Sequence, residues 1–184
     1  MNAISAQQAW EVLQRADCLH SPERVEAALA DMALRINQAL AGTDPLVVCV
    51  MTGGVVPFGQ LLPRFQFPLQ IDYVHATRYG KKLHGGQLQW ISGPNQDPRG
   101  RTILLSDDIL DEGTTLAGIE ARYRAEGARE LYKAVLVVKN RPRQFDVKVE
   151  FAGLEVPDRY VFGCGMDYKG YLRNIAGIYA EAEN

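Results

Sequence analysis

The residues best suited to chemistry form one run in the middle of the chain, Asp107-Asp108-Ile109-Leu110-Asp111-Glu112-Gly113-Thr114-Thr115. An apolar, strand-like segment precedes this run, and a predicted helix follows it. Backbone amides at a helix N-terminus, together with the positive end of the helix dipole, bind phosphate groups. Asp111 to Thr115 could therefore wrap a phosphate with amides and two hydroxyls, and Gly113 would let the backbone approach it closely.

The adjacent carboxylates Asp107 and Asp108 suggest a sugar site beside the phosphate site. In an extended chain they point in opposite directions, so at least one faces the end of the strand and can accept hydrogen bonds from ribose hydroxyls. Helix capping is the simpler alternative, and it would explain one Asp and one Thr. It does not explain three acids followed by Gly-Thr-Thr, so the run predicts a cradle for a ribose phosphate.

The segments around this run alternate between strand and helix patterns. Before it we predict a buried strand over Leu46 to Met51, a helix over Val55 to Leu62 and a strand over Leu69 to His75. At and after it we predict a strand over Thr102 to Leu105, a helix over Leu116 to Glu126 and a strand over Tyr132 to Val138. This order predicts an α/β fold with a mainly parallel twisted sheet flanked by helices, which binds ligands at the carboxyl ends of its strands.

The remaining segments carry weaker patterns. Two helices are predicted between Ser5 and Leu40, separated at Ser21-Pro22, and Thr77 to Arg99 reads as a long loop or hairpin. Short strands are predicted over Val147 to Phe151 and Tyr160 to Gly163, before an irregular end. We expect one domain, with N-terminal helices over 1–44, a core sheet over 45–145 and a C-terminal part over 146–184.

Composition excludes several classes of protein. The 184 residues carry a formal net charge of −2 and a sequence pI near 5.9, which argues against a general nucleic-acid binder. The cysteines Cys18, Cys49 and Cys164 form neither a disulfide framework nor a zinc-binding spacing. With neither a signal-peptide pattern nor a membrane-spanning apolar run, the sequence predicts a cytoplasmic protein.

The run from Asp107 to Thr115 resembles the phosphoribosyl-pyrophosphate motif of the type I phosphoribosyltransferases. Other segments resemble the hypoxanthine-guanine branch of that family, in chain order and over most of the chain from Leu46 onward: Met51-Thr52-Gly53-Gly54, Val138-Lys139, Val156-Pro157-Asp158-Arg159-Tyr160-Val161, Met166-Asp167-Tyr168 and Tyr171-Leu172-Arg173-Asn174. The resemblance implies a parallel sheet with a small hood from the chain ends. It also implies a magnesium-dependent glycosyltransferase of purine salvage, which moves ribose 5-phosphate from its pyrophosphate onto hypoxanthine or guanine and forms IMP or GMP.

The resemblance also implies roles for the residues of the cradle. Asp107 and Asp108 would hold the ribose hydroxyls. Asp111 would lie beside purine N7 as the catalytic proton acceptor or as an electrostatic partner. The 5-phosphate would be held by four consecutive residues, Glu112, Gly113, Thr114 and Thr115.

Further roles fall on the segments downstream and upstream of the cradle. By the same resemblance, Lys139 would donate to the 6-oxo group of the purine, Tyr160 would stack on the base, and Val161 would read it through backbone groups. Asp167 and Asp107 would hold Mg²⁺. Pyrophosphate would be bound by Thr52, Gly53 and Arg173.

Two positions depart from the family pattern. Thr52 stands where one branch has a lysine, so pyrophosphate contact there would rest on backbone amides. The family lid carries a Ser-Tyr pair, whereas this chain has Arg78-Tyr79, which we take as the tip of a lid over Thr77 to Gln89. A basic surface loop is the alternative reading of that segment.

Other functions remain compatible with the sequence. The same frame could serve a phosphoribosyltransferase that prefers xanthine or another base. It could also serve a non-catalytic regulator that senses phosphoribosyl pyrophosphate, although the low pI argues against a nucleic-acid-binding one. A receiver-type phosphorylation domain would carry its acid pair near the first strand rather than in mid-chain. The family resemblance also favours a homodimer or homotetramer.

Overall fold

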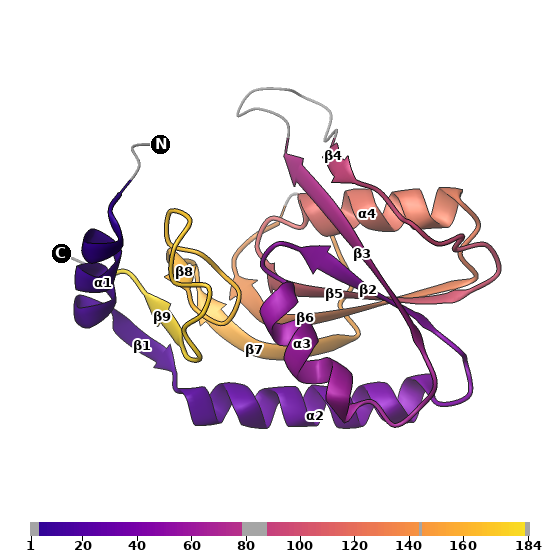
Figure 1. The fold of residues 1–184 in the computed structure, drawn as a ribbon, viewed down its shortest axis with the longest axis horizontal. Helices are drawn as coiled ribbons and strands as arrows, with labels where there is room; N and C mark the ends of the chain where they lie inside the picture. The colour runs from indigo at the N-terminus through magenta and orange to yellow at the C-terminus, as the bar shows by residue number, and fades with distance from the viewer. Residues whose placement is uncertain (1–3, 79–87, 144, 183–184) are drawn as a thin grey trace.

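The structure is a computed structural model, which describes residues 4–78, 88–143 and 145–182. Within them, a six-stranded sheet has the order β4-β3-β2-β5-β6-β7 (Figure 1). Its strands are β2 (Leu46–Met51), β3 (Gln70–Arg78), β4 (Leu88–Ser92), β5 (Thr102–Leu110), β6 (Glu130–Asn140) and β7 (Phe151–Pro157). Neighbouring strands are parallel except β3 and β4, which form an antiparallel hairpin. The predicted α/β class with a mainly parallel sheet is confirmed.

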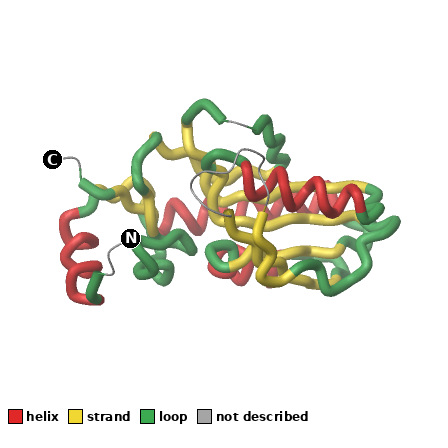
Figure 2. Tube along the Cα trace, turned by 90° about the horizontal axis from the view of Figure 1, so that it is seen from above, coloured by secondary structure: helices red, strands yellow, loops and turns green. Residues whose placement is uncertain are grey.

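Helices cover both faces of the sheet, which explains why its central strands are apolar on both sides. The helices α2 (Pro22–Leu40) and α3 (Val55–Leu61) lie on one face, and α4 (Thr114–Ala125) lies on the other (Figures 1 and 2). A 3-10 turn over Leu62–Arg64 follows α3. Successive residues of β5 alternate between the two cores: Leu104 packs in the α2 core, and Leu105 packs in the α4 core. This packing fixes which side each acid of β5 faces.

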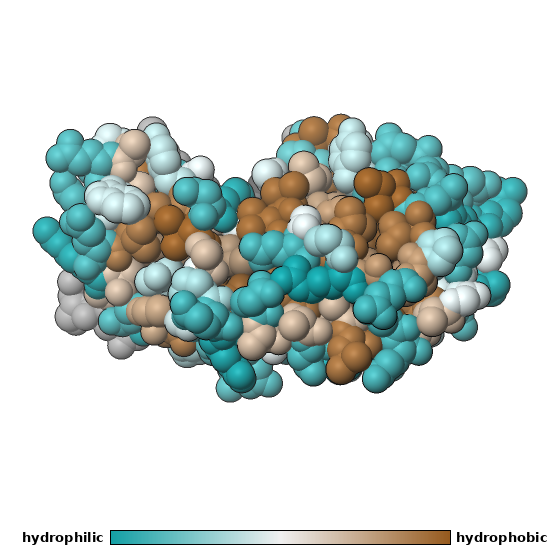
Figure 3. Space-filling view, turned by 60° about the horizontal axis from the view of Figure 1, so that its bottom comes forward, coloured by the Kyte–Doolittle hydropathy of each residue, from teal (hydrophilic) through white to brown (hydrophobic). Residues whose placement is uncertain are grey.

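Both ends of the chain build a separate small sheet, which we call the hood. It consists of β1 (Asp17–His20), β9 (Ile178–Ala180) and β8 (Val161–Phe162), paired antiparallel in that order. Helix α1 (Ala6–Arg15) packs on it through a small core of Ala9, Phe162, Tyr168 and Leu172. The space-filling view shows a notch between the hood and the main body (Figure 3).

Several expected boundaries were wrong. The strand predicted over Val147 to Phe151 begins only at Phe151, as β7. Because β7 is an edge strand of the main sheet, that sheet also extends past the expected boundary at residue 145. The central strand β5 continues to Leu110 rather than ending at Leu105, so Asp107 and Asp108 lie within it. Helix α4 begins at Thr114, two residues before its expected start at Leu116.

The hood strands β1 and β9 were not predicted at all. Each has three or four residues, and β1 lies between two helices. The hairpin of β3 and β4 accounts for part of the irregular segment 77–99. Among the described residues, no helix has the length and apolar character needed to cross a membrane.

Candidate active site

The predicted functional residues gather where the parallel strands of the main sheet end. Strand β2 ends at Met51 and leads into Thr52-Gly53-Gly54, while β5 ends in the acidic run and β6 ends just after Lys139. Parallel strands bring their carboxyl ends to the same edge of a sheet. In Figure 1 these ends point toward the hood. The loop that follows hood strand β8 contains Gly165. That loop touches the β2 end, because a Cβ at Gly165 would lie 2.2 Å from the Gly53 carbonyl oxygen.

The paired acids of β5 are both buried, with 8% of each residue exposed. The Asp108 amide donates to Asp107 Oδ1 at 2.9 Å, and the Ile109 amide donates to Asp108 Oδ1 at 2.8 Å. Burial raises the pKa of Asp107 well above its ordinary value, and the negative charge of Asp108 raises it further. Burial also raises the pKa of Asp108, and its hydrogen bonds with the Asp107 side chain and the Ile109 amide, followed by the charge of Arg173, partly offset that increase. Burying two adjacent carboxylates costs folding free energy. Such an arrangement is typical of a functional site rather than of a hydrophobic core.

Gly53 lies directly against the second of these acids. A Cβ placed on Gly53 would lie 1.7 Å from Asp108 Oδ2, so any larger residue would displace the carboxylate. Thr52 is exposed, and a cis peptide bond joins it to Met51. The loop after β2 therefore brings backbone next to the acid pair without an intervening side chain.

The segment that opens α4 has the geometry expected of a phosphate cradle. Gly113 precedes the helix in the left-handed region, with φ of +81°, a conformation that favours glycine. The Ala117 amide donates to the Gly113 carbonyl oxygen at 2.9 Å and closes the first turn. The amides of Thr114, Thr115 and Leu116 come before that bond and point out of the helix end. The positive end of the α4 dipole thus faces the same side as the acid pair.

Asp111 and Lys139, predicted to act on the base, are ion-paired to each other. Lys139 Nζ lies 3.0 Å from Asp111 Oδ2, and its side chain is only 11% exposed. The pair belongs to a larger cluster. Arg141 Nη1 lies 3.0 Å from Asp111 Oδ1, and Asp158 Oδ1 lies 3.3 Å from Arg141 and 3.8 Å from Lys139.

Arg143 completes this cluster through the backbone. It donates from Nε to the Asp111 carbonyl oxygen at 3.2 Å and from Nη2 to the Lys139 carbonyl oxygen. Arg141, Arg143 and Asp158 were not predicted as members of the site. For the two arginines, the sequence did contain an indication, because they follow Lys139 at intervals of two residues, just past the end of β6.

The aromatic residue predicted to stack on a base lies between the main sheet and the hood. Tyr160 is 49% exposed and makes an edge-on contact with Tyr168 at 5.4 Å between ring centroids. Its hydroxyl donates to the Asp167 carbonyl oxygen at 3.3 Å. Val161, which follows it, is buried in β8. A partly open aromatic face beside buried backbone is suited to a flat ligand.

Asp167 and Arg173 also meet in the structure. Arg173 Nη2 lies 2.6 Å from Asp167 Oδ1, and Arg173 Nη1 donates to the Gly165 carbonyl oxygen at 2.6 Å. Within the described part of the chain, no three His, Cys, Asp or Glu side chains form a group that could hold a metal ion. A magnesium ion held by the predicted ligands Asp167 and Asp107 would therefore need substrate oxygens to complete its coordination, which is how Mg²⁺ usually binds.

The expected lid lies largely outside the described residues. The backbone of Arg78 ends β3, but Tyr79 and the segment 79–87 lie outside the described part of the chain. The proposal that Arg78 and Tyr79 form the tip of a lid is not tested by this structure.

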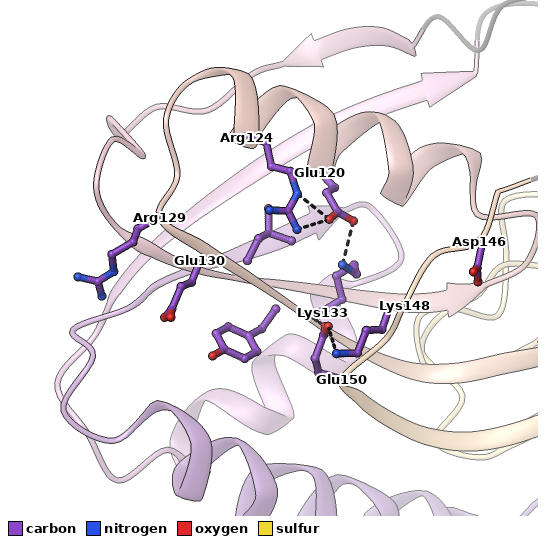
Figure 4. Close-up of a pocket in the computed structure, with 10 residues that line it drawn as sticks. Glu120, Arg124, Arg129, Glu130, Lys133, Asp146, Lys148 and Glu150 are labelled. Atoms are coloured by element: carbon purple, nitrogen blue, oxygen red, sulfur yellow. Dashed lines mark hydrogen bonds and ion pairs between the residues drawn. The ribbon is translucent and has the colours of Figure 1, made fainter.

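A second hollow, of about 460 Å³, lies between α4, the start of β6 and residues 146–150 (Figure 4). Its charged lining consists of four acids and four bases: Glu120, Glu130, Asp146, Glu150, Arg124, Arg129, Lys133 and Lys148. Lys133 is buried and donates to Glu120 at 2.8 Å, and Arg124 pairs with the same carboxylate at 2.7 Å. The described lining of this hollow includes neither the acid pair of β5 nor the N-terminus of α4, which are the features of the strand-end site.

Comparisons with known proteins identify the family of the chain. A family model described as "Phosphoribosyl transferase domain" matches residues 16–169. A hypoxanthine-guanine phosphoribosyltransferase of Bacillus subtilis is 29% identical over 161 residues, which cover 87% of this chain and 89% of the relative.

Solved structures show a similar fold. A hypoxanthine phosphoribosyltransferase from Staphylococcus aureus superposes with a TM-score of 0.87 at 23% identity, covering 92% of this chain and 94% of the other. A hypoxanthine-guanine phosphoribosyltransferase from Bacillus anthracis has a TM-score of 0.82 at 25% identity, covering 90% and 98%.

Proposed function

The chain belongs to the phosphoribosyl transferase family, and we propose that it is the purine-salvage enzyme that transfers a 5-phosphoribosyl group from phosphoribosyl pyrophosphate to hypoxanthine or guanine. The reaction, a glycosyl (pentosyl) transfer, yields IMP or GMP and pyrophosphate. One observation supports this proposal most directly. A buried acid pair, a helix N-terminus behind Gly113 and the pair of Lys139 and Asp111 meet at one edge of the sheet.

The substrate would lie along this edge with its sugar over β5. Asp107 and Asp108 accept hydrogen bonds from the ribose hydroxyls. The backbone amides and side-chain hydroxyls within Glu112 to Thr115 hold the 5-phosphate. Thr52 and Gly53 offer backbone amides to the pyrophosphate. Arg173 adds a positive charge there, where negative charge develops as the leaving group departs.

The purine would enter between Tyr160 and the end of β6. Tyr160 offers a ring face for stacking, and the neighbouring backbone of Val161 reads the edge of the base. Lys139 turns from Asp111 to donate to the 6-oxo group, while Asp111 takes the proton from the purine nitrogen. Lys139 and Arg173 are each paired with a carboxylate in the structure, so substrate binding exchanges these partners for substrate oxygens.

Magnesium completes the proposed chemistry. When bound, Mg²⁺ supplies charge neutralisation to the pyrophosphate. Asp167 and Asp107 would hold it together with substrate oxygens, in keeping with the few protein carboxylates that Mg²⁺ uses. Arg173 would have to release Asp167 for this purpose.

The test is a spectrophotometric assay with phosphoribosyl pyrophosphate and MgCl₂ against hypoxanthine, guanine, xanthine and adenine, each alone. We expect turnover with hypoxanthine or guanine and little with adenine, because Lys139 donates to a 6-oxo group that adenine lacks. Preference for xanthine would instead support a phosphoribosyltransferase that acts on xanthine. Binding of phosphoribosyl pyrophosphate without turnover of any base would support a sensing regulator and overturn the enzyme.

Gly53→Ala tests the contact between the β2 loop and the acid pair. The new Cβ would displace the Asp108 carboxylate, and a charged hydrogen bond of this kind contributes about 1.5–3 kcal/mol. We expect affinity for phosphoribosyl pyrophosphate, measured by calorimetry, to fall by roughly 10-fold or more.

Gly59→Ala is the matched control, since this glycine lies inside α3 with nothing within 4 Å of the added Cβ. It should raise stability by about 0.5–1 kcal/mol and leave affinity unchanged. Equal affinities for the two variants would contradict the proposed role of the Gly53 contact.

We also propose a cytoplasmic homodimer or homotetramer. The described cysteines are free thiols, as expected in a reducing compartment. Ile71, Tyr73 and Ile91 lie on β3 and β4 and are 51%, 48% and 60% exposed. Exposed apolar groups of this size favour a protein partner, and we assign it to a second copy of the chain. Analytical ultracentrifugation at micromolar concentration would reveal a monomer if this assignment is wrong.

A further inference from the structure

Arg141 carries a role that the proposed function does not yet include. The structure assigns Arg141 as a positioning residue, which holds Asp111 in place while Lys139 leaves it to contact the purine. This inference rests on the proposed function, because it concerns the proton acceptor of that same reaction. It depends on four charged side chains at the ends of β5, β6 and β7.

Each oxygen of the Asp111 carboxylate has its own cation. Oδ2 pairs with Lys139 at 3.0 Å, and Oδ1 pairs with Arg141 at 3.0 Å. A purine nitrogen that gives its proton to Asp111 must approach one of these oxygens within hydrogen-bonding distance. One cation must therefore withdraw when the base binds.

Lys139 is the cation that is suited to withdraw. It has a new acceptor in the 6-oxo group of the bound purine, and its second carboxylate contact, with Asp158, is long at 3.8 Å. Arg141 is anchored more closely, at 3.3 Å from the same Asp158 oxygen. Oδ2 then becomes free for the purine, while Oδ1 keeps its hydrogen bond from Arg141.

The backbone around this exchange is fixed by Arg143. Its guanidinium donates to the carbonyl oxygens of both Asp111 and Lys139, so the chain segments that carry the acid and the lysine stay together. Rotation of the Asp111 side chain is then the remaining freedom. Arg141 restricts that rotation, because its bond to Oδ1 orients the whole carboxylate plane.

The orientation matters at the transfer step. As the bond between the anomeric carbon and the purine nitrogen forms, the bond to the pyrophosphate oxygen breaks, and its electron pair leaves with pyrophosphate. The proton on the purine passes to Asp111 Oδ2. A reacting group misplaced by about 1 Å can cost up to about 100-fold in rate, so loss of Arg141 should lower kcat more than it changes substrate affinity.

The experiment compares Arg141→Ala, Arg141→Gln and Arg141→Lys with the intact enzyme in steady-state assays, in which phosphoribosyl pyrophosphate and hypoxanthine are each varied in turn while the other is saturating. We expect Arg141→Ala and Arg141→Gln to lower kcat by about 10- to 100-fold and to change KM for phosphoribosyl pyrophosphate by less than about 3-fold. Arg141→Lys should recover part of kcat, because it restores one donor to Oδ1. Arg124→Ala, which breaks an ion pair of similar length in the second hollow, is the control and should leave kcat unchanged.

A double-mutant cycle separates positioning from folding. When Asp111→Asn is already present, adding Arg141→Ala should change kcat by less than about 2-fold, since residues that act as a unit are not additive. An unchanged kcat in Arg141→Ala, or an equal loss with and without Asp111→Asn, would overturn the inference. If Arg141→Ala does not fold, the Gln and Lys variants provide the same comparison. Absence of turnover in the intact chain would instead overturn the proposed function.

Discussion

Asp111→Asn is expected to lower kcat by about 100- to 1000-fold, within the roughly 100- to 10,000-fold range typical of losing a general base. Asparagine keeps the shape of the side chain and an oxygen that can accept the Arg141 hydrogen bond, but it cannot take a proton from the purine. Affinity for phosphoribosyl pyrophosphate should change by less than about 3-fold, because the sugar and phosphate are held by other groups. Stopped-flow and steady-state assays would measure kcat, and calorimetry would measure the dissociation constant.

Asp31→Asn provides the control for this change. Asp31 is an exposed residue of α2 that pairs with Arg35 at 2.9 Å, far along the chain from the site. Exposed ion pairs of this kind contribute little to stability, and Asp31 is not one of the site residues. The activity of the Asp31→Asn variant should therefore match that of the unmodified protein. If Asp111→Asn keeps full turnover, Asp111 has no catalytic role. Arg141 then cannot contribute to catalysis by positioning Asp111.

The acidic run was predictable because its parts are adjacent in sequence. A strand that leads into acids, then Gly-Thr-Thr and a helix, predicts both the sheet edge and the helix N-terminus without any long-range contact. The alternation of strands and helices likewise predicted β2, α3, β3, β5, α4 and β6 in chain order, although not β4, which lies in the segment read as a long loop or hairpin. Local patterns of this kind survive folding, because each is consistent with its tertiary surroundings.

The features that the sequence did not reveal depend on contacts between distant segments. The hood strand β1 pairs with β9 across almost the whole chain, and neither is long enough to show a period. The contact of Gly53 with Asp108 requires β2 and β5 to be neighbours, although the chain places β3 and β4 between them. Such contacts are properties of the topology rather than of any one window of sequence.

The charge cluster around Asp111 shows the same limit on a smaller scale. Lys139 and Asp111 were each expected beside a purine, but their pairing with one another was not predicted. Arg141 reads as an ordinary basic residue after a strand until β5, β6 and β7 bring it to Asp111 and Asp158. Electrostatic partners in a site are therefore harder to predict than the residues whose backbone conformation is special, such as Gly113.

Asp107→Asn is expected to have opposite effects on binding and on stability. The ribose hydroxyls would lose a charged acceptor, which contributes about 1.5–3 kcal/mol, so affinity for phosphoribosyl pyrophosphate should fall by roughly 10- to 100-fold. The protein without substrate should instead become more stable near neutral pH. Burial and the neighbouring Asp108 raise the pKa of Asp107 in the folded state, so ionisation of this group opposes folding.

The pH dependence of this stability gain has a definite sign. Because the folded-state pKa is raised above the unfolded value, the folded state binds more protons, and its stability falls as pH rises between the two values. Asparagine at position 107 does not ionise, so the variant does not lose stability in this way as pH rises. The Tm of Asp107→Asn minus that of the unmodified protein should therefore grow as pH rises from about 4, near the unfolded pKa, toward neutrality. Thermal melts in metal-free buffer would measure it, and each kcal/mol gained would raise Tm by about 2–4 °C.

Asp72→Asn is the matched control, because Asp72 is buried to the same extent, at 8% exposure, but satisfied differently. Its carboxylate accepts hydrogen bonds from the Tyr73 amide, from the Asn95 amide and side chain, and from the Gln96 amide, at 2.7 to 3.1 Å. Asparagine would lose several of these bonds, so this variant should have a lower Tm. A lower Tm for both variants would show that Asp107 stabilises the fold, and that the acid pair is structural rather than held for the substrate.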